Sequence, residues 1–243
     1  RFKAYEENGS DFASLDARAL DGYFLPGNLA LAVYHPQEAL LGQLCPGTPI
    51  LFVGNFNFGT ISMYQVGPFG RLLNYGLPFG FYGQGDACLR GPQGMAVSDT
   101  GEIYVVDSLN NRMAKWRILQ TGQVVFIKNF DWKDSSGAKD PAPFTPTDVA
   151  LDAAGRVVVS DQFNNRICFF DRDGQSLWCC GRESYWEEGD PDGEKFMLPT
   201  SLAIDGEFLI VNDLVNRALK LFRIGDRSLD FVGGISLFKL SVE

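Results

Sequence analysis

The clearest fold signal in the sequence is the stretch GPQGMAVSDTGEIYVVDSLNNRMAKWRI at residues 91–118. Two later stretches, TPTDVALDAAGRVVVSDQFNNRICFFDRDGQ (145–175) and LPTSLAIDGEFLIVNDLVNRALKLFRI (198–224), repeat its pattern. Each runs through a Pro, a short apolar strand, an acidic turn with Gly, a second apolar strand, an Asp, an Asn-Arg pair and a third strand. Successive copies begin roughly 50 residues apart, a period that is typical of repeat architectures.

Each copy predicts four short strands joined by hairpins. In the clearest copy we expect the strands at 95–98, 103–106, 113–117 and 124–128. The turns carry Gly with Asp, Asn or Thr, which tolerate the positive φ of tight hairpins. Four-stranded antiparallel sheets that repeat without helices predict an all-β fold, the β-propeller, because radial packing buries both faces of every blade and protects the edges.

We expect a single β-propeller domain over residues 1–243 with four full blades, one of them a degenerate copy in which Asn55 replaces the Asp. The first fifteen residues align with the third and fourth strands of a blade, and the last four align with a first strand. A fifth blade would then be split between the two ends. The chain forms either a five-bladed ring or a segment of a longer ring, and we favour the segment. The expected blades lie near residues 1–16 (partial), 26–76, 92–130, 146–180, 199–232 and 238–243 (partial).

The string GEIYVVDSLNNR at 101–112 and its echo at 155–166 resemble NHL repeats. The resemblance covers residues 26–232, although the copies at 198–223 and 49–65 depart from the motif. It implies a propeller, usually of six blades. Some NHL propellers bind single-stranded RNA, and other six-bladed propellers are enzymes that hold calcium on the central axis.

The repeated polar residues are expected to shape the turn between the second and third strands. Asp and Asn side chains bond to the nearby backbone, and Arg pairs with a neighbouring Asp. A ligand rarely needs the same group on every blade, so we interpret these residues as structural. They are Asp107, Asn110, Asn111, Arg112, Asp161, Asn164, Asn165, Arg166, Asp213, Asn216 and Arg217.

Motifs for catalysis or metal binding are weak. His35 is the only histidine and no C-x-x-C pair exists, which argues against a zinc site. Residues 99–101 spell Asp-Thr-Gly, but we interpret them as a hairpin turn. The calcium-like strings at 171–174 and 190–193 give no EF-hand, since Pro199 takes the place of the last carboxylate in the second loop. We expect no cofactor.

An axial calcium site of a hydrolase or lyase is the alternative. The positions that would face the central funnel hold Asn28, Gly94, Asp148 and Ser201. One carboxylate and one amide are few ligands for calcium, which takes six to eight oxygens. A further blade could add ligands.

The linkers between blades, at 74–92, 130–146 and 181–199, are the expected partner site. They combine aromatic residues with Gly, Pro and charge, and loops on rigid scaffolds often carry function. Tyr82, Trp132, Tyr185 and Trp186 are the candidate partner-binding aromatics, expected to be exposed, whereas Phe79, Phe144 and Phe196 are expected to tuck between blades. At the opposite end, residues 34–49 form a long insertion with an expected helical turn at 37–44, either a partner contact or an ornament.

The composition limits the classes of partner that the chain is expected to bind. Lys and Arg number 21 against 30 Asp and Glu, a net charge of -9, which disfavours nucleic acid because phosphates bind through Lys and Arg. No apolar run reaches the length of a membrane span, so we expect no membrane insertion. The five cysteines are odd in number, and Cys179 and Cys180 are adjacent, which predicts no disulfide framework and an intracellular, reducing setting.

Together these features predict a non-enzymatic scaffold that binds another protein or a larger protein complex through its interblade linkers. The axial calcium enzyme is the first alternative. Binding of single-stranded RNA is the second.

Overall fold

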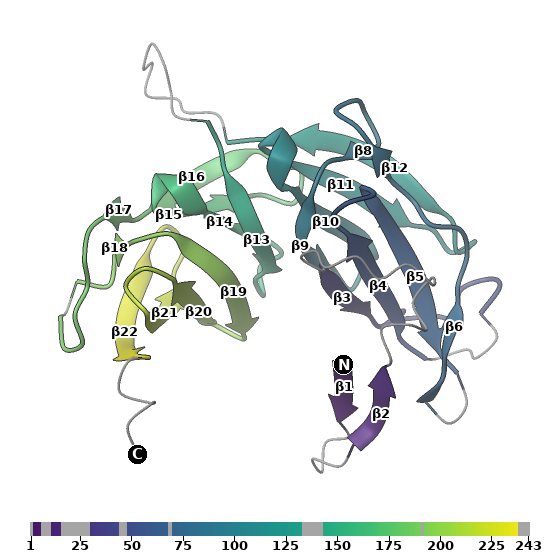
Figure 1. Ribbon diagram of the computed structural model, residues 1–243, viewed down its shortest axis with the longest axis horizontal. Coiled ribbons are helices and arrows are strands. Elements are labelled where there is room, and N and C mark those ends of the chain that lie inside the picture. The colour runs from purple at the N-terminus through teal and green to yellow at the C-terminus, as the bar shows by residue number, and fades with distance from the viewer. Residues whose placement is uncertain are drawn as a thin grey trace.

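The structure is a computed structural model in which four antiparallel sheets follow one another in an open arc (Figure 1). It describes residues 2–5, 11–15, 30–43, 48–67, 70–132, 143–190 and 192–237. The predicted all-β propeller with blades of four antiparallel strands is confirmed. Within the described residues, no helix has the length and apolar character to cross a membrane.

Each sheet is one blade. Blade 1 consists of β3 (Leu31–Tyr34), β4 (Ile50–Asn55), β5 (Thr60–Val66) and β6 (Leu72–Asn74). Blade 2 consists of β9 (Pro92–Val97), β10 (Glu102–Asp107), β11 (Arg112–Ile118) and β12 (Val124–Phe130). Blade 3 consists of β13 (Pro146–Leu151), β14 (Val157–Asp161), β15 (Arg166–Phe170) and β16 (Ser176–Cys180). Blade 4 consists of β19 (Pro199–Asp205), β20 (Phe208–Asp213), β21 (Ala218–Ile224) and β22 (Leu229–Ser236).

Two linkers form small parallel ladders. In the linker before blade 2, β7 (Phe81–Tyr82) pairs with β8 (Cys88–Leu89). In the linker before blade 4, β17 (Arg182–Glu183) pairs with β18 (Lys195–Phe196). These pairings give the linkers a defined backbone shape.

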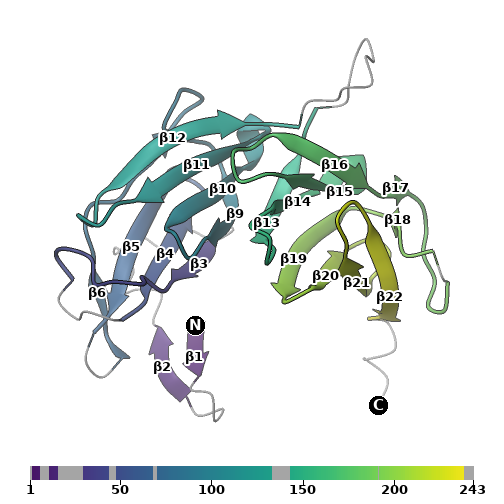
Figure 2. The ribbon, with the colours of Figure 1, turned by 180° about the vertical axis from the view of Figure 1, so that it is seen from behind.

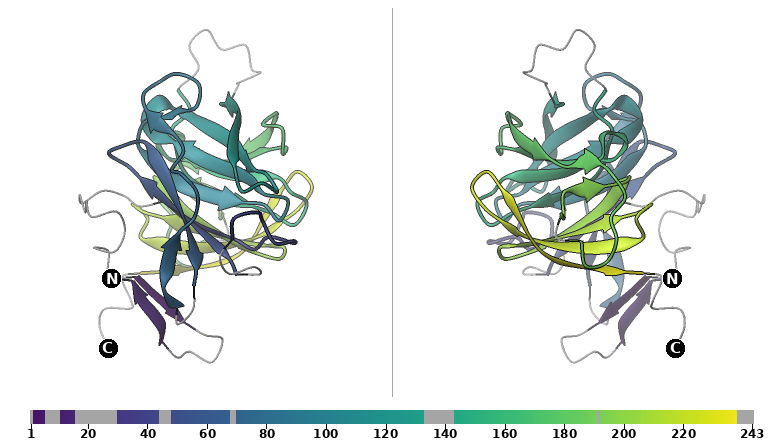
Figure 3. Two further views of the ribbon diagram at one scale, coloured as in Figure 1. Left: turned by 90° about the vertical axis from the view of Figure 1, so that its right-hand side faces the viewer. Right: turned by 90° about the vertical axis from the view of Figure 1, so that its left-hand side faces the viewer.

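The N-terminal residues form a hairpin of β1 (Phe2–Tyr5) and β2 (Asp11–Leu15), the arrangement expected for the third and fourth strands of a blade. The hairpin projects beyond the four blades (Figure 3). The strand expected at 238–243 lies outside the described residues. The split blade and the number of blades in the ring therefore stay predictions.

The first strand of each blade lies nearest the centre of the arc, and the fourth lies outside (Figures 1 and 2). Because neighbouring side chains on a strand point to opposite faces, a middle strand can bury both sets. Ile103 and Val105 of β10 pack toward blade 1, whereas Tyr104 and Val106 pack toward blade 3. Three apolar clusters fill the spaces between successive blades in this way.

The insertion in blade 1 fastens two blades together. Its Leu41 donates a backbone hydrogen bond to Gln120 O of blade 2 at 2.9 Å, and Tyr75 Oη donates to Leu41 O at 2.9 Å. The expected helical turn is wrong for residues 37–43, which form bends and a turn, and residues 44–47 lie outside the described residues. The described part of the insertion therefore links blade 1 to blade 2.

A disulfide joins Cys168 of β15 to Cys179 of β16. The sequence predicted no disulfide framework and missed this single bridge. An odd cysteine count leaves room for one bridge, and these two residues face each other across the ladder. Cys180 packs on the opposite face, with the cluster between blades 3 and 4, and is free, as is Cys88. Since disulfides persist in oxidising compartments, the cysteines no longer support a reducing setting.

The three residues at the same place in blades 2, 3 and 4, three positions before the repeated Asp, differ in exposure: Tyr104 is 1% exposed, Val158 0% and Ile210 43%. We expect Val158→Asp to lower the free energy of unfolding by more than about 3 kcal/mol, because it buries an unpaired charge between blades. Ile210→Asp, the matched control, should cost about 1 kcal/mol or less. Urea unfolding measures both, and equal losses would contradict the packing described.

Candidate functional site

A buried carboxylate ends the second strand of blades 2, 3 and 4. Asp107, Asp161 and Asp213 are each 0% exposed. One oxygen of each carboxylate accepts a hydrogen bond from a backbone N–H that leads into the first strand of the same blade. These bonds join Arg90 N to Asp107 (2.5 Å), Thr145 N to Asp161 (2.7 Å) and Met197 N to Asp213 (2.7 Å).

The second oxygen of each carboxylate pairs with a cation. Arg112 Nε lies 2.8 Å from Asp107, and Arg166 Nε lies 2.7 Å from Asp161. In blade 4 the cation is Lys220, whose Nζ lies 2.8 Å from Asp213 Oδ2 with both side chains fully buried. Burial lowers the pKa of Lys220, and the hydrogen bond to Asp213 opposes that shift.

Sequence reasoning missed Lys220 and expected Arg217 at this place. Arg217 instead has the left-handed backbone conformation of the turn, with a φ of 47°, as do Asn111 (54°), Asn165 (53°) and Gly59 (61°). The motif of blade 4 is therefore displaced by one residue relative to our alignment. The sequence signal was Lys220 itself, a charged residue between Ala218 and Phe222 on the otherwise apolar buried face of its strand.

The same residues hold the linkers. Arg112 donates to Gln84 O at 3.0 Å and to Gly85 O and Cys88 O at 2.9 Å each. Asn110 Nδ2 donates to Gly83 O at 2.9 Å. In blades 3 and 4, Asn164 and Asn216 bond to linker carbonyls in the same manner. The motif therefore has a structural role, because its hydrogen bonds hold the linkers between blades in place.

Trp132 and Trp186 lie against the motif cations, so the expectation that they are exposed is wrong. The Arg166 guanidinium lies 5.3 Å from the Trp132 ring centroid, and Lys220 Nζ lies 5.1 Å from that of Trp186. Trp186 is only 5% exposed, while Trp132 is half-buried. A cation over an indole face is a favourable contact. These contacts stabilise the positions of both rings against the blades and away from solvent.

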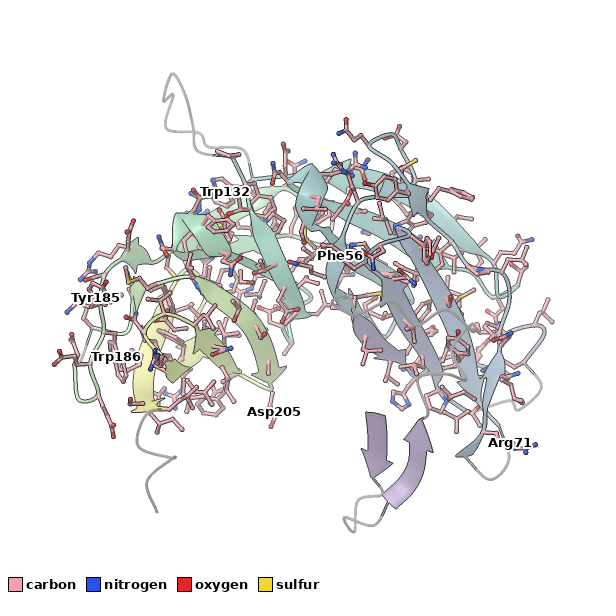
Figure 4. All side chains as sticks on the ribbon, viewed as in Figure 1. Phe56, Arg71, Trp132, Tyr185, Trp186 and Asp205 are labelled. Carbon is pink, nitrogen blue, oxygen red and sulfur yellow. A yellow bond between two sulfur atoms is a disulfide. The ribbon has the colours of Figure 1, made fainter. Side chains whose placement is uncertain are left out.

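The other candidate aromatics lie where they were expected. Tyr82 is 60% exposed and Tyr185 is 70% exposed. Figure 4 shows Tyr185 and Trp186 near each other on the linker at the outer side of blade 4. The three phenylalanines expected between blades are buried: Phe79, Phe144 and Phe196.

The turns between second and third strands carry exposed apolar side chains that sequence reasoning missed. We call these side chains the top-turn residues, and the end of the blades that carries them and the linkers the top face. The sequence signal that could have identified them is an apolar residue inside an otherwise polar Asp-x-x-Asn turn. The top-turn residues are Phe58 (46% exposed), Leu109 (52%), Phe163 (68%), Leu214 (49%) and Val215 (41%).

The expected axial positions meet in a pocket of about 500 Å³ near the first strands. Gly94, Asp148 and Ser201 line it, and Asn28 lies outside the described residues. Asp148 Oδ2 accepts a hydrogen bond from Leu202 N of blade 4 at 2.8 Å, and its Oδ1 accepts from Val149 N at 2.9 Å. This carboxylate therefore ties blade 3 to blade 4. The part of the chain that the structure describes holds no cluster of three or more metal-ligating side chains.

Comparison with known proteins agrees with this reading of the repeats. The NHL repeat family matches residues 89–116. NHL repeat-containing protein 3 of Mus musculus is 33% identical over 209 residues, covering 80% of this chain and 53% of that protein. The Homo sapiens protein of the same name is 36% identical over 127 residues, covering 51% of this chain and 32% of that protein. The chain therefore spans about half the length of the mouse relative, and its match to the human relative covers a smaller part of that protein.

Solved structures share the fold. The periplasmic gluconolactonase of Pseudomonas aeruginosa superposes with a TM-score of 0.55 at 16% identity, over 78% of this chain and 51% of that chain. A streptogramin B lyase superposes with a TM-score of 0.51 at 12% identity, over 84% and 58%. The chain is a β-propeller built from repeated four-stranded blades. It belongs to the NHL-repeat family of β-propellers.

The buried pair of blade 4 gives a stability prediction. Asp213→Asn leaves the Lys220 ammonium buried without its counter-charge, which should cost about 3–5 kcal/mol of unfolding free energy. Adding Lys220→Met removes that charge and should recover part of the loss. Glu207→Gln, which alters an exposed contact to Arg223, is the control and should cost under about 1 kcal/mol. Urea unfolding measures the stability of all three variants. A double variant that is less stable than Asp213→Asn would contradict the destabilisation by an unpaired Lys220.

Asp148 gives a prediction about pH. Burial raises the pKa of its carboxyl, and the bonds from Leu202 and Val149 offset this only in part. Because the folded state favours the neutral acid, the ionised group destabilises the fold at neutral pH, and this cost disappears as the pH falls through the folded pKa. The stability of the wild type relative to Asp148→Asn should therefore improve between pH 7 and about pH 4. Thermal unfolding across that range tests it, and a constant difference would contradict it.

Proposed function

We propose that the chain is a non-enzymatic scaffold that binds another protein through its top face. The observation that carries the proposal is the exposed apolar side chain on the second-to-third-strand turn of every described blade. Apolar side chains exposed at one end of a rigid fold are typical of interaction surfaces. Tyr82 and Tyr185 add aromatic area to the same face, and tyrosines are common binding hot spots.

The fastening of the linkers supports this proposal. A binding loop that is already held in its bound shape loses less conformational entropy on association. Arg112 alone donates to three linker carbonyls, and Lys220 and Arg166 hold a linker tryptophan. The top face is thus a preorganised surface, and Trp132 and Trp186 support it from beneath.

The axial enzyme is less favoured by the residues present. Both oxygens of Asp148 accept backbone hydrogen bonds, and burial raises its pKa, so the carboxylate is committed to joining two blades. The gluconolactonase and lyase with this fold are too distant in sequence to assign their activities here. Single-stranded RNA is disfavoured by the six acidic side chains of the linker at 181–199.

Site-specific photo-crosslinking tests the proposal. A photoreactive amino acid at Phe163 or Tyr185 should give a recurrent adduct with one other protein in an extract of the source cells. The same photoreactive amino acid at Asp205, the last residue of β19 before the first-to-second-strand turn of blade 4, is the matched control and should not give that adduct (Figure 4). Adducts that are equal at all three positions would contradict a top-face site.

Substitution separates binding residues from supporting ones. Tyr185→Ala and Phe163→Ala remove exposed side chains, so each should change the unfolding free energy by no more than about 0.5 kcal/mol. If they are hot spots, each should weaken partner binding roughly 30-fold. Trp186→Ala should instead cost about 3–5 kcal/mol of stability, because the ring is buried beneath Lys220. Calorimetric unfolding and pull-down titration measure the two effects, and a stable Trp186→Ala variant would refute the buried role.

A further inference from the structure

We propose that the partner of the top face binds by a polypeptide segment in which Lys or Arg residues flank apolar ones, and that this segment lies across blades 3 and 4. The inference rests on the proposed function and names the chemistry of the partner. Its surface comprises the top-turn residues Phe163, Leu214 and Val215, the linker at 181–199, and Tyr185 within that linker.

The linker and the two turns form one continuous surface. Leu198 N donates to Asn165 Oδ1 in the turn of blade 3 at 2.8 Å. Leu214 N and Val215 N, in the turn of blade 4, donate to the linker carbonyls of Leu198 (3.3 Å) and Met197 (3.0 Å). The linker therefore lies between the turns and is bonded to both, so its charged residues share the top face with the apolar side chains of the turns.

A second set of bonds fixes the outer part of the linker. Asn216 Oδ1 accepts from Trp186 N at 3.1 Å, and Asn216 Nδ2 donates to Ser184 O at 3.1 Å. These two bonds hold the backbone on both sides of Tyr185, whose ring is 70% exposed. Tyr185 is thus a fixed aromatic side chain at the edge of the surface.

The linker carries six acidic and two basic side chains, so its net charge is 2 − 6 = −4. Both basic residues are already engaged, since Lys195 Nζ lies 2.5 Å from Asp190 and Arg182 pairs with Asp192. Glu183, Glu187 and Glu194 are exposed and form no ion pair within the described residues. Arg217, exposed on the turn of blade 4, adds one positive charge and leaves the surface acidic.

Charge complementarity identifies the occupant. Exposed carboxylates beside apolar anchors favour a segment with basic side chains, which speeds encounter and suppresses acidic partners. The aromatic side chains of Phe163 and Tyr185 supply the main contact area, because hot spots are enriched in desolvated aromatic residues and in Arg. The same carboxylates repel phosphate, so RNA and anionic lipid surfaces fit less well than a basic polypeptide.

Selection from a library of random 12-residue peptides displayed on phage tests the inference with the full chain. We expect selected peptides to be enriched in Lys or Arg next to apolar residues. Binding of the synthesised peptides should weaken at least about tenfold between 50 and 500 mM NaCl, because salt screens exposed charges. This salt measurement uses the wild-type protein and does not depend on the folding of any variant.

Charge reversal locates the effect. The triple variant Glu183→Lys, Glu187→Lys and Glu194→Lys should weaken peptide binding at least about tenfold. The matched control is Asp99→Lys, Asp205→Lys and Asp226→Lys, which makes the same change in net charge at exposed positions at the opposite end of the blades. The control should change binding less than about twofold, since its sites lie beyond the screening distance of the linker.

The outcomes separate this inference from the proposed function. Peptides that require Phe163 and Tyr185 but show no basic enrichment would overturn the inference and leave the scaffold proposal standing. Selected peptides that bind equally well without Phe163 and Tyr185 would overturn both. Equal weakening by the two triple variants, or tighter binding of a single-stranded RNA 20-mer than of any peptide, would also overturn the inference.

Discussion

The buried carboxylate at the end of the second strand is the constraint on which the rest of this propeller depends. Asp107, Asp161 and Asp213 are removed from water, and a buried carboxylate is stable only when it is paired and hydrogen-bonded. Each one therefore binds a cation and a backbone N–H of the incoming chain. Turn shape, linker path and the position of the linker aromatics follow from that pairing.

Much of the fold could be predicted because its signals are local and repeated. Alternating apolar residues, turn glycines and the recurring Asp each act within one blade, and blades 2, 3 and 4 show the same pattern. Two of the errors concern contacts that depend on how strands and linkers come together in the folded chain. Trp186 meets Lys220 only after the linker folds back over blade 4, and Cys168 meets Cys179 only once the register of the hairpin is set. Neither contact has a sequence spacing that identifies it.

The candidate site shows the same division. Exposed Tyr82 and Tyr185 could be inferred from linker composition, whereas the top-turn residues could not, because the turn was interpreted through its polar members. The short 3-10 helices Ser108–Asn110 and Gln162–Asn164 end in a left-handed Asn, and the polar residues of the turn face inward to the buried Asp. Leu109 and Phe163 are then left facing solvent. The apolar residues of these turns are exposed because the polar residues of the same turns point inward to bond the buried Asp.

Repetition and variation on this fold have different physical origins. The carboxylate and its cation have to satisfy the same buried geometry in blades 2, 3 and 4. Lys220 can replace the Arg only because it reaches the same carboxylate oxygen from a different place on its strand. The exposed positions meet no such requirement, and they differ between blades in size and in the charge of the adjacent linker. Blade 4 combines the most acidic linker with two exposed apolar turn residues. A partner that distinguishes one side of the arc from another has to contact these unrepeated features. The specificity proposed for this surface therefore depends on the acidic linker beside blades 3 and 4 and not on the repeated geometry beneath it.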